Sequence, residues 1–272
     1  MGLKIKEEVL KQIDAGFLIT SEYPQWLANI VAVPKKDGKV RMCVDYRDLN
    51  KVSPKDDFPL PHIDVLVDST AKCKVFSFMD GFSGYNQTKM APKDREKTSF
   101  ITPWGAFCYL VMPFGLINVG ATYQRGMTKI FHDMMHKEIE VYVDDTIVKS
   151  GTEEEHVEYL LKMFQRLRKY KLRLNPNKCI FGVRLGKLLG FIVSQKGIEV
   201  DPDKVRAIRE LSAPKTKKQV RGFLGRLNSI SRFISHMTAT CVPMFKLLRK
   251  DRGIIWTEDC QKAFDKIKEY LL

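Results

Sequence analysis

The chain has 272 residues, 44% of them hydrophobic, which is enough to bury a sizeable core and too many for a disordered chain. No apolar run reaches the length of a membrane span and no signal peptide precedes the first helix-like segment, so we expect a soluble, intracellular protein with no membrane partner. Six scattered cysteines without a Cys-x-x-Cys pair indicate reduced thiols rather than disulfides or a zinc site.

The formal net charge of +14 is unevenly distributed along the chain. Residues 159–198 contain ten Lys or Arg and no acid, and residues 213–250 contain nine and again no acid. Solvated surfaces usually mix both signs of charge. The long acid-free tracts therefore favour a polyanionic partner, and nucleic acid is the leading one.

The N-terminal segment predicts a helix over 3–15, followed by strands at 29–34 and 40–46. Residues 35–39 join these strands and contain Asp-Gly, a strong hairpin signal. An ordinary β-ribbon explains this pattern. The functional alternative is a basic tip that grips phosphates, built on Lys35, Lys36, Lys39 and Arg41.

The middle of the chain alternates short strands and helices. We expect a helix at 63–68, strands at 74–79, 87–91, 98–102 and 107–112, and a helix at 121–136. The first of these strands ends at Asp80, which a glycine-bearing turn follows. A carboxylate in that place is typical of a functional position.

Two β-like runs, at 138–141 and 146–149, meet at the adjacent acids Asp144 and Asp145. Acids at a hairpin tip are usually just solvated, because Asp is a favoured turn residue. A tight turn that aims two carboxylates at one point also suits a divalent cation. The hairpin alone does not decide between these interpretations.

The last third begins with a capping box at 152–155 that predicts a helix to about residue 170. More sheet is expected at 172–174 and 187–193, and from Asp201-Pro202 the pattern is helical to the end. The nearest thing to a domain boundary is therefore the turn at 197–202.

A helix predicted at 217–233 has an apolar face opposite Lys218, Arg221, Gly225 and Arg232. Glycine inside a helix costs about 1 kcal/mol relative to alanine, so Gly222 and Gly225 indicate the close approach of a bulky group. Helix–helix packing is one explanation. The basic neighbours favour a nucleic-acid backbone.

Asp80, Asp144 and Asp145 are three carboxylates on two β-like elements. If one antiparallel sheet brings them together, they could hold two Mg²⁺ ions about 3.5–4 Å apart. Oxygen-only ligands suit magnesium, with Mn²⁺ as a second candidate. Such a pair would activate a primer 3′-hydroxyl and bind a nucleoside triphosphate.

Seven motifs, in order, resemble the reverse transcriptase of gypsy-like (Metaviridae-type) long-terminal-repeat retrotransposons, of the kind abundant in plants. They are Tyr46-Arg-Asp-Leu-Asn50, Phe58-Pro-Leu-Pro61, Met79-Asp-Gly-Phe-Ser-Gly-Tyr-Asn86, Val111-Met-Pro-Phe-Gly-Leu116, Gly120-Ala-Thr-Tyr-Gln124, Tyr142-Val-Asp-Asp145 and Leu189-Gly-Phe191. The resemblance covers almost the whole chain.

The resemblance implies an α+β right-hand polymerase, with an antiparallel palm sheet packed on helices and a helical thumb. Residues 1–200 would form the fingers (about 1–60 and 90–120) and the palm (about 61–89 and 121–200). Residues 201–272 would form the thumb and the start of a tether.

The resemblance also implies roles for individual residues. The catalytic, metal-binding residues would be Asp80, Asp144 and Asp145. The residues that contact the incoming nucleotide would be Lys35, Arg41, Tyr85, Phe114 and Lys178. Of these, Tyr85 matches the aromatic gate that excludes a ribose 2′-hydroxyl. Lys178 resembles a residue proposed to protonate the leaving pyrophosphate, and a plain surface lysine explains it as well. The residues at the primer and template would be Tyr142, Leu189, Gly190, Phe191, Lys218, Arg221 and Gly225.

The resemblance places such a domain in a polyprotein with a protease, a ribonuclease H and an integrase, none of which this sequence resembles. The chain stops where a ribonuclease H domain would begin, so we expect a copy truncated at that point. Ile117 and Val119 depart from residues that are commonly polar or small in the family. Family context implies cytoplasmic virus-like particles with later access to the nucleus.

The leading hypothesis is an RNA- and DNA-directed DNA polymerase that extends a primer with deoxynucleoside triphosphates (dNTPs) on an RNA template or a DNA primer–template duplex. The alternative is a non-catalytic nucleic-acid-binding remnant. A metal-dependent nuclease is a third reading, in which Tyr85 and the basic hairpin have no evident purpose.

Overall fold

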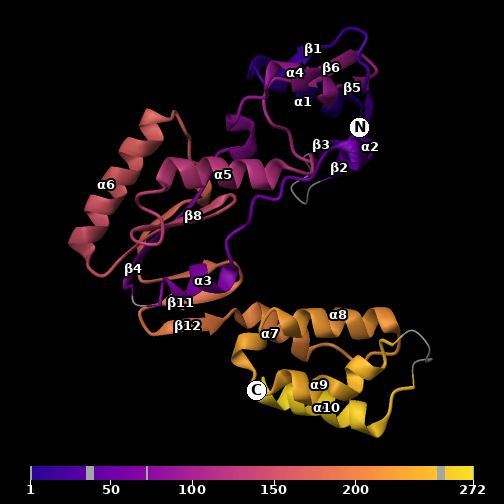
Figure 1. The fold of residues 1–272 in the computed structure, drawn as a ribbon, viewed down its shortest axis with the longest axis vertical. Helices are drawn as coiled ribbons and strands as arrows, with labels where there is room; N and C mark the ends of the chain where they lie inside the picture. Colours follow the sequence, from indigo (N-terminus) through magenta and orange to yellow (C-terminus); the bar gives the residue numbers. More distant parts are fainter. Residues whose placement is uncertain (1, 35–39, 72, 250–254, 272) are drawn as a thin grey trace. The chain divides into compact units, whose positions relative to one another are not determined.

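The structure is a computed structural model that describes residues 2–34, 40–71, 73–249 and 255–271. The chain divides into two compact units, Met1–Arg184 and Leu185–Leu272 (Figure 1), and each is described by itself. The sequence suggests a boundary at residue 201 instead. In the structure, residues 185–200 belong to the second unit. Their three strands form a sheet of their own and pair with no other described strand.

In the first unit, helix α1 (Gly2–Asp14) packs against a five-stranded sheet with the order β1-β6-β5-β2-β3. The helix buries Val9, packs Ile5 and Ile13 on the same core, and is followed by Gly16 at φ +72°. This confirms the predicted helix. The strands of the sheet are β1 (Leu18–Thr20), β2 (Ala28–Pro34), β3 (Val40–Val44), β5 (Phe100–Thr102) and β6 (Gly105–Tyr109).

The hairpin of β2 and β3 is confirmed, with Ile30 opposite Val44. Its connecting residues 35–39, including the predicted nucleotide contact Lys35, lie outside the described residues. Strand β2 also pairs with β5 in parallel, which joins the hairpin to the rest of the sheet.

Short helices connect this sheet to a second one. They are α2 (Arg47–Val52), α3 (Ile63–Asp68), η1 (Gly84–Gln87), α4 (Pro92–Arg95) and η2 (Glu96–Thr98). The strand predicted at 87–91 is wrong. The backbone closes 3₁₀-type turns there, with Asn86 N–H donating to Ser83 C=O and Thr88 N–H donating to Tyr85 C=O, and only a bridge at Lys89 remains.

The second sheet of the first unit has the order β7-β8-β4-β9. Its strands are β4 (Val75–Asp80), β7 (Ile139–Tyr142), β8 (Asp145–Ser150) and β9 (Ile180–Val183). Helices α5 (Val119–Phe131) and α6 (Glu153–Lys169) pack on it, and Phe131, Ile139 and Met163 lie in their shared core. The predicted capping box is confirmed at the start of α6, and a short helix η3 (Pro176–Lys178) precedes β9.

A buried ion pair lies beneath the β7–β8 hairpin. Glu140 on β7 and Lys149 on β8 have side chains 2% and 3% exposed, with Lys149 Nζ 2.7 Å from Glu140 Oε1. Lys149 Nζ also donates to the Ser69 carbonyl, and the Ser69 hydroxyl donates to Glu140 Oε1. Each charge therefore has partners inside the protein, as buried charges require.

A second buried polar group joins α6 to this sheet. His156 on α6 contacts the Ser77 hydroxyl of β4 through Nε2 at 2.7 Å and the Ser150 hydroxyl of β8 through Nδ1 at 3.0 Å. The Ser77 hydroxyl also accepts a bond from the Gly182 N–H on β9. One imidazole thus links three strands and a helix, and its burial lowers the pKa of His156 below its usual 6.5.

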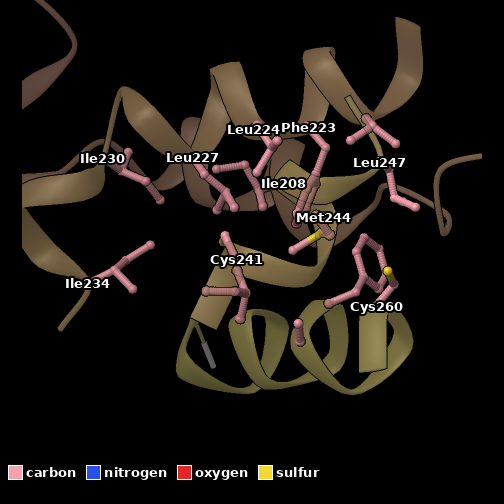
Figure 2. Close-up of a cluster of buried hydrophobic side chains, with 14 residues drawn as sticks. Ile208, Phe223, Leu224, Leu227, Ile230, Ile234, Cys241, Met244, Leu247 and Cys260 are labelled. Carbon is pink, nitrogen blue, oxygen red and sulfur yellow. The ribbon is translucent and has the colours of Figure 1, made fainter. Parts of the chain in front are cut away.

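The second unit begins with a three-stranded antiparallel sheet of β10 (Leu185–Leu188), β11 (Phe191–Ser194) and β12 (Gly197–Val200). Helices α7 (Pro202–Arg209), α8 (Lys217–Asn228), α9 (Met237–Lys246) and α10 (Glu258–Tyr270) follow, with η4 (Ser231–Phe233) between α8 and α9. Figure 2 shows Ile208, Phe223, Met244 and Cys260, one from each α-helix, meeting in a single buried cluster.

Helix α8 is shorter than the helix predicted at 217–233. It starts with a capping box between Thr216 and Gln219 and ends at Asn228, after which Ser231–Phe233 forms η4. The apolar face is as predicted, since Val220, Phe223, Leu224 and Leu227 are all buried.

The fold as a whole is a mixed α+β fold with antiparallel sheets, as expected. Among the described residues, none of the helices is both long enough and apolar enough to cross a bilayer.

Candidate active site

The two predicted acidic motifs lie side by side in one sheet. Asp80, the last residue of β4, pairs with Asp145, the first residue of β8. Tyr142 pairs with Asp145 across the β7–β8 hairpin, so Val143 and Asp144 form its two-residue loop. The structure therefore gathers all three predicted carboxylates at one end of the sheet.

The loop that carries Asp144 is strained. Val143 has φ +50°, a left-handed conformation that a β-branched residue rarely adopts and that costs of the order of 1–3 kcal/mol. Gln124, a fully buried residue of α5, stabilises this conformation through two hydrogen bonds. Its Oε1 accepts from Val143 N–H at 2.6 Å, and its Nε2 donates to the Val141 carbonyl at 3.0 Å.

Asp144 lies against η1. A Cβ at Gly84 would stand 2.9 Å from Asp144 Oδ1 and 3.1 Å from the Tyr123 hydroxyl, so only glycine leaves room for this carboxylate. Asp144 Oδ1 is buried and accepts no hydrogen bond from any residue that the structure describes. Desolvation, together with the charges of Asp80 and Asp145, raises the pKa of Asp144.

Lys178, at the end of η3, forms an ion pair with Asp80, with 2.9 Å between Nζ and Oδ2. Partial desolvation and the charge of Asp80 raise the pKa of Asp145, while Lys178 opposes this rise. Lys178, predicted to contact the incoming nucleotide, therefore contacts the Asp80 carboxylate in this structure, and its predicted role stays a prediction.

The residues present suit divalent cations by their chemistry. Three carboxylates converge, two with raised pKa values caused in part by mutual repulsion, and one carboxylate oxygen is buried without a partner among the described residues. Within residues 2–34, 40–71, 73–249 and 255–271, however, no three His, Cys, Asp or Glu side chains form a ready-made metal site. A cation held by Asp80 would therefore have to replace its contact with Lys178.

An aromatic cluster flanks these carboxylates. The Tyr85 ring on η1 meets the Phe114 ring edge-on, with 4.8 Å between centroids, and the Tyr123 ring at 5.2 Å. Burial, followed by the Asp144 charge, raises the pKa of Tyr85 to about 12. Tyr85 and Phe114, both predicted to contact the incoming nucleotide, therefore touch each other, and Tyr85 lies beside Asp144.

The loop that presents Phe114 is fixed by Asn50. Its Nδ2 donates to the Gly115 carbonyl at 2.7 Å, and its Oδ1 accepts from Ile117 N–H at 2.8 Å. Gly115 has φ +100° and packs against the Tyr46 ring, which favours glycine there. Asn50 and Gly115 lie in the motifs at 46–50 and 111–116, and the sequence predicts no individual role for either.

A cavity of about 620 Å³ opens beside this cluster. Its lining includes Arg41 on β3, Ser83 and Asn86 near η1, Phe114, and charged residues of both signs on α1: Lys4, Glu7, Glu8 and Lys11. Arg41 is exposed and lines this cavity, and its contact with a nucleotide stays a prediction.

The predicted primer and template residues of the second unit lie at a turn and on a helix. Leu189 and Gly190 form the two-residue loop between β10 and β11, both with positive φ, as a type I′ turn requires. A Cβ at Gly190 would clash with Lys204, whose Nζ lies over the Phe191 ring at 4.9 Å. Lys218, Arg221 and Gly225 are exposed on α8.

Gln124, Gly84 and Asn50 are site residues whose roles sequence reasoning missed. Each lies inside a recognised motif, and that was the available signal. Periodicity could not identify them because their partners are backbone groups and side chains distant in the chain.

The reverse transcriptase (RNA-dependent DNA polymerase) family matches residues 33–193 of the chain. This match agrees with the β7–β8 hairpin, which carries Asp144 and Asp145 beside Asp80, and it defines the class of protein. The chain belongs to the reverse transcriptase family.

Relatives in that family are transposon polyproteins. The chain is 33% identical over 280 residues to the retrovirus-related Pol polyprotein from transposon 297 of Drosophila melanogaster, covering 99% of this chain and 26% of the relative. It is 32% identical over 243 residues to the transposon Tf2-3 polyprotein of Schizosaccharomyces pombe, covering 89% of this chain and 18% of the relative. The chain therefore spans about a quarter or less of the length of these relatives.

Solved structures confirm the expected polymerase fold. A foamy viral protease–reverse transcriptase in complex with double-stranded DNA matches with a TM-score of 0.90 at 24% identity, covering 98% of this chain and 47% of that one. The same kind of protein in complex with an RNA/DNA hybrid matches with a TM-score of 0.83 at 23% identity, covering 99% and 36%.

Proposed function

We propose that the protein is an RNA- and DNA-directed DNA polymerase that extends a primer 3′ end with dNTPs. The observation that carries this proposal is the convergence of Asp80, Asp145 and Asp144, with the buried Oδ1 of Asp144 left without a partner among the described residues. A surface turn with solvated acids would not leave a carboxylate oxygen in this state.

Asp80, Asp144 and Asp145 would hold two Mg²⁺ ions. When bound, such ions lower the pKa of the attacking hydroxyl and stabilise negative charge on the attacking and leaving oxygens. The protein's part is to fix the carboxylates, which it does through the β4–β8 register and the Gln124 contacts to the loop. Lys178 would leave Asp80 and face the departing pyrophosphate, where its ammonium can donate a proton.

The cavity beside η1 would receive the incoming nucleotide. Arg41 offers a fork of N–H donors that suits phosphate oxygens. Phe114 holds the Tyr85 ring edge-on, and this fixed ring would exclude a ribose 2′-hydroxyl. These contacts support selection of deoxynucleotides.

The exposed face of α8 would follow the primer–template backbone. A Cβ added at Gly222 or Gly225 would meet no atom of the described residues within 4 Å, so packing within the unit does not require glycine at either position. Close approach by an external partner does explain them, and Lys218 and Arg221 supply positive charge on the same helix. Binding to phosphates would make affinity fall steeply with salt.

The relatives support an origin in a gypsy-like retrotransposon polyprotein, and the motif set is the ground for a plant source. The solved neighbours are complexes with double-stranded DNA and with an RNA/DNA hybrid, which are the partners proposed here. Cytoplasmic particles with nuclear access would be the corresponding location.

A primer-extension assay tests the proposal. The 272-residue protein is given a primed RNA template, MgCl₂ and labelled dNTPs, with Asp144→Asn as the matched control, because this change removes the charge and keeps the shape. We expect extension by the native protein and none above background by the variant, while both bind the primer–template in a gel-shift assay.

Other outcomes would select the other functions. Binding without extension by the native protein would overturn the polymerase and favour the non-catalytic remnant. Shortening of the primer or template that is lost in Asp144→Asn would favour the nuclease.

A further inference from the structure

Helix α6 has an exposed face that the proposed polymerase mechanism does not use. The helix lies at one side of the first unit (Figure 1) and packs on the second sheet through His156, Met163 and Leu167, which are buried. On the side away from the sheet, Val157 is 69% exposed and Leu161 is 57% exposed. A surface helix of a globular protein normally directs its large aliphatic side chains to the core, so this face has the character of a contact surface.

The same face carries an acid near the start of α6 and a base near its end. At 100° per residue, the exposed side chains of Glu154 and Arg168 lie within about 60° of those of Val157 and Leu161. Neither charged side chain has an ion pair or a hydrogen bond with any residue that the structure describes. Charges of these signs suit the helix dipole, but the dipole does not explain the aliphatic residues between them.

The order of these side chains is self-complementary when the helix is turned end over end. Leu161 lies seven residues after Glu154 and seven residues before Arg168. A two-fold axis through Leu161 therefore places Glu154 of one copy level with Arg168 of the partner subunit, and the symmetry repeats this contact at the other end. The two Leu161 side chains then meet at the axis, with Val157 between the axis and the charged pair.

We propose that this face of α6 binds the same face of a second copy of the chain, as an antiparallel helix pair in a two-fold symmetric dimer. Charge complementarity selects a second copy as the occupant, because a surface that carries both signs at equal distances from an apolar centre fits itself. The inference goes beyond the proposed function, and none of the α6 residues named here belongs to the carboxylate cluster.

The size of the contact sets the expected strength. One pair of 17-residue helices is a smaller contact than the interfaces of about 1,200–2,000 Å² that hold stable complexes, and each copy carries a formal net charge of +14. We therefore expect a weak dimer with a Kd on the order of 10 µM, which forms and dissociates with concentration.

Sedimentation equilibrium of the 272-residue protein tests this proposal, at fixed salt and from about tenfold below to tenfold above the expected Kd. Glu154→Arg and Arg168→Glu each place like charges opposite one another at both ends, so we expect each to raise Kd at least about tenfold. Arg168→Glu is the sharper of the two variants. It lowers the net charge of each copy, so general repulsion alone would predict tighter association.

Mixing the two variants tests the antiparallel geometry. In an equimolar mixture each Glu154→Arg copy faces opposite charges on an Arg168→Glu copy at both ends, and we expect a mixed dimer with a Kd close to native. Leu161→Gln should weaken the native dimer about tenfold, because it removes the apolar contact at the axis. Glu22→Arg, at an exposed position outside α6, makes the same charge change as Glu154→Arg and should leave Kd unaltered.

Far-UV circular dichroism and Tm of each variant verify the fold, since all substituted side chains are exposed. A native protein that stays monomeric over the whole concentration range would overturn the proposal. An unchanged Kd in both single charge variants would also overturn it and would assign any dimer to another surface. Two monomeric variants that fail to associate when mixed would exclude the antiparallel pairing. Primer extension is measured separately, so failure of the polymerase assay leaves this test intact.

Discussion

Gly84 and Asp144 are in contact across the gap between η1 and the β7–β8 hairpin, and the space for the Asp144 carboxylate exists only because residue 84 has no side chain. A Cβ at position 84 would lie 2.9 Å from Asp144 Oδ1, closer than real Cβ atoms approach. The dependence of a proposed metal ligand on a glycine 60 positions earlier in the sequence is a direct test of the site.

Gly84→Ala should therefore displace Asp144 and lower kcat for primer extension by about 10²-fold, the cost of an ångström-scale misplacement. Gly126→Ala on α5 is the matched control, because a Cβ there meets no atom of the described residues within 4 Å and alanine favours the helix. Equal activity of the two variants would contradict the assigned position of Asp144.

Asp144→Asn should stabilise the metal-free protein. The pKa of Asp144 is raised above 3.8, so the native state binds this proton more tightly than the unfolded state does. Its contribution to stability is present below pH 3.8 and is lost as the pH rises through the native pKa. At pH 7 the ionised Asp144 carboxylate therefore destabilises the native state. We expect asparagine at this position to raise Tm by a few degrees, on the order of the usual gain from one stabilising substitution.

Asp133→Asn is the control of opposite sign. The hydrogen bond from Arg166 lowers the pKa of Asp133 to about 2, so this carboxylate stabilises the protein above pH 3.8, and its loss should lower Tm slightly. If both substitutions shift Tm in the same direction, the repulsion assigned to Asp144 is wrong.

His156 should make the protein sensitive to mild acid. Its pKa is lowered by burial, so the unfolded state binds a proton that the native state does not. The free energy of unfolding therefore decreases as the pH falls below 6.5. The contribution of His156 to this decrease ends once the pH is below its native pKa. His156→Gln should remove this part of the pH dependence, measured as the urea midpoint between pH 7 and pH 5. An unchanged slope in the variant would assign the sensitivity to other groups.

Tyr85→Val should admit ribonucleotides. Removal of the ring opens the sugar position beside Asp144, and the discrimination against a ribonucleoside triphosphate should fall by about 10²-fold in kcat/KM. The measurement is insertion of UTP against dTTP on a primed template, with Tyr123→Phe as an aromatic control in the same cluster. Unchanged sugar selectivity would eliminate Tyr85 as the gate.

Gly225→Ala should separate folding from binding. Alanine favours the helix by about 1 kcal/mol, and its methyl group meets no atom of the described residues within 4 Å, so Tm should rise. The same methyl group would obstruct a backbone that approaches α8, so Kd for a primer–template should increase about tenfold at fixed salt. A rise in Tm without weaker binding would place the nucleic acid elsewhere.

The amino-acid sequence predicts the elements with strong local signals. The helix at α1, the β2–β3 hairpin and the capped start of α6 are confirmed because periodicity, Asp-Gly and the 152–155 capping box are local features. The strand predicted at 87–91 fails because 3₁₀-type turns after Ser83 override a weak β pattern. The extra length predicted for α8 fails since apolar spacing continues through a turn into η4.

For the site, sequence motifs predict which residues matter, and the structure shows how they are held. Asp80 and Asp145 pair within one antiparallel sheet, which is the arrangement considered from the sequence. The Gln124 contacts and the space at Gly84 depend on contacts between distant segments. No local pattern encodes such contacts.

The buried Glu140–Lys149 ion pair also stabilises the register of β7 against β8. A slip of β7 against β8 by one residue would turn Glu140 and Lys149 to opposite faces, and separating such a pair costs about 3–5 kcal/mol. The same slip would break the pairing of Tyr142 with Asp145 and displace the loop that carries Asp144, whereas the pairing of Asp80 with Asp145 belongs to the separate β4–β8 register. Misaligned β7–β8 pairings are therefore penalised by a contact outside the carboxylate cluster, and we expect a substitution of Glu140 to loosen the loop that carries Asp144 as well as to lower stability.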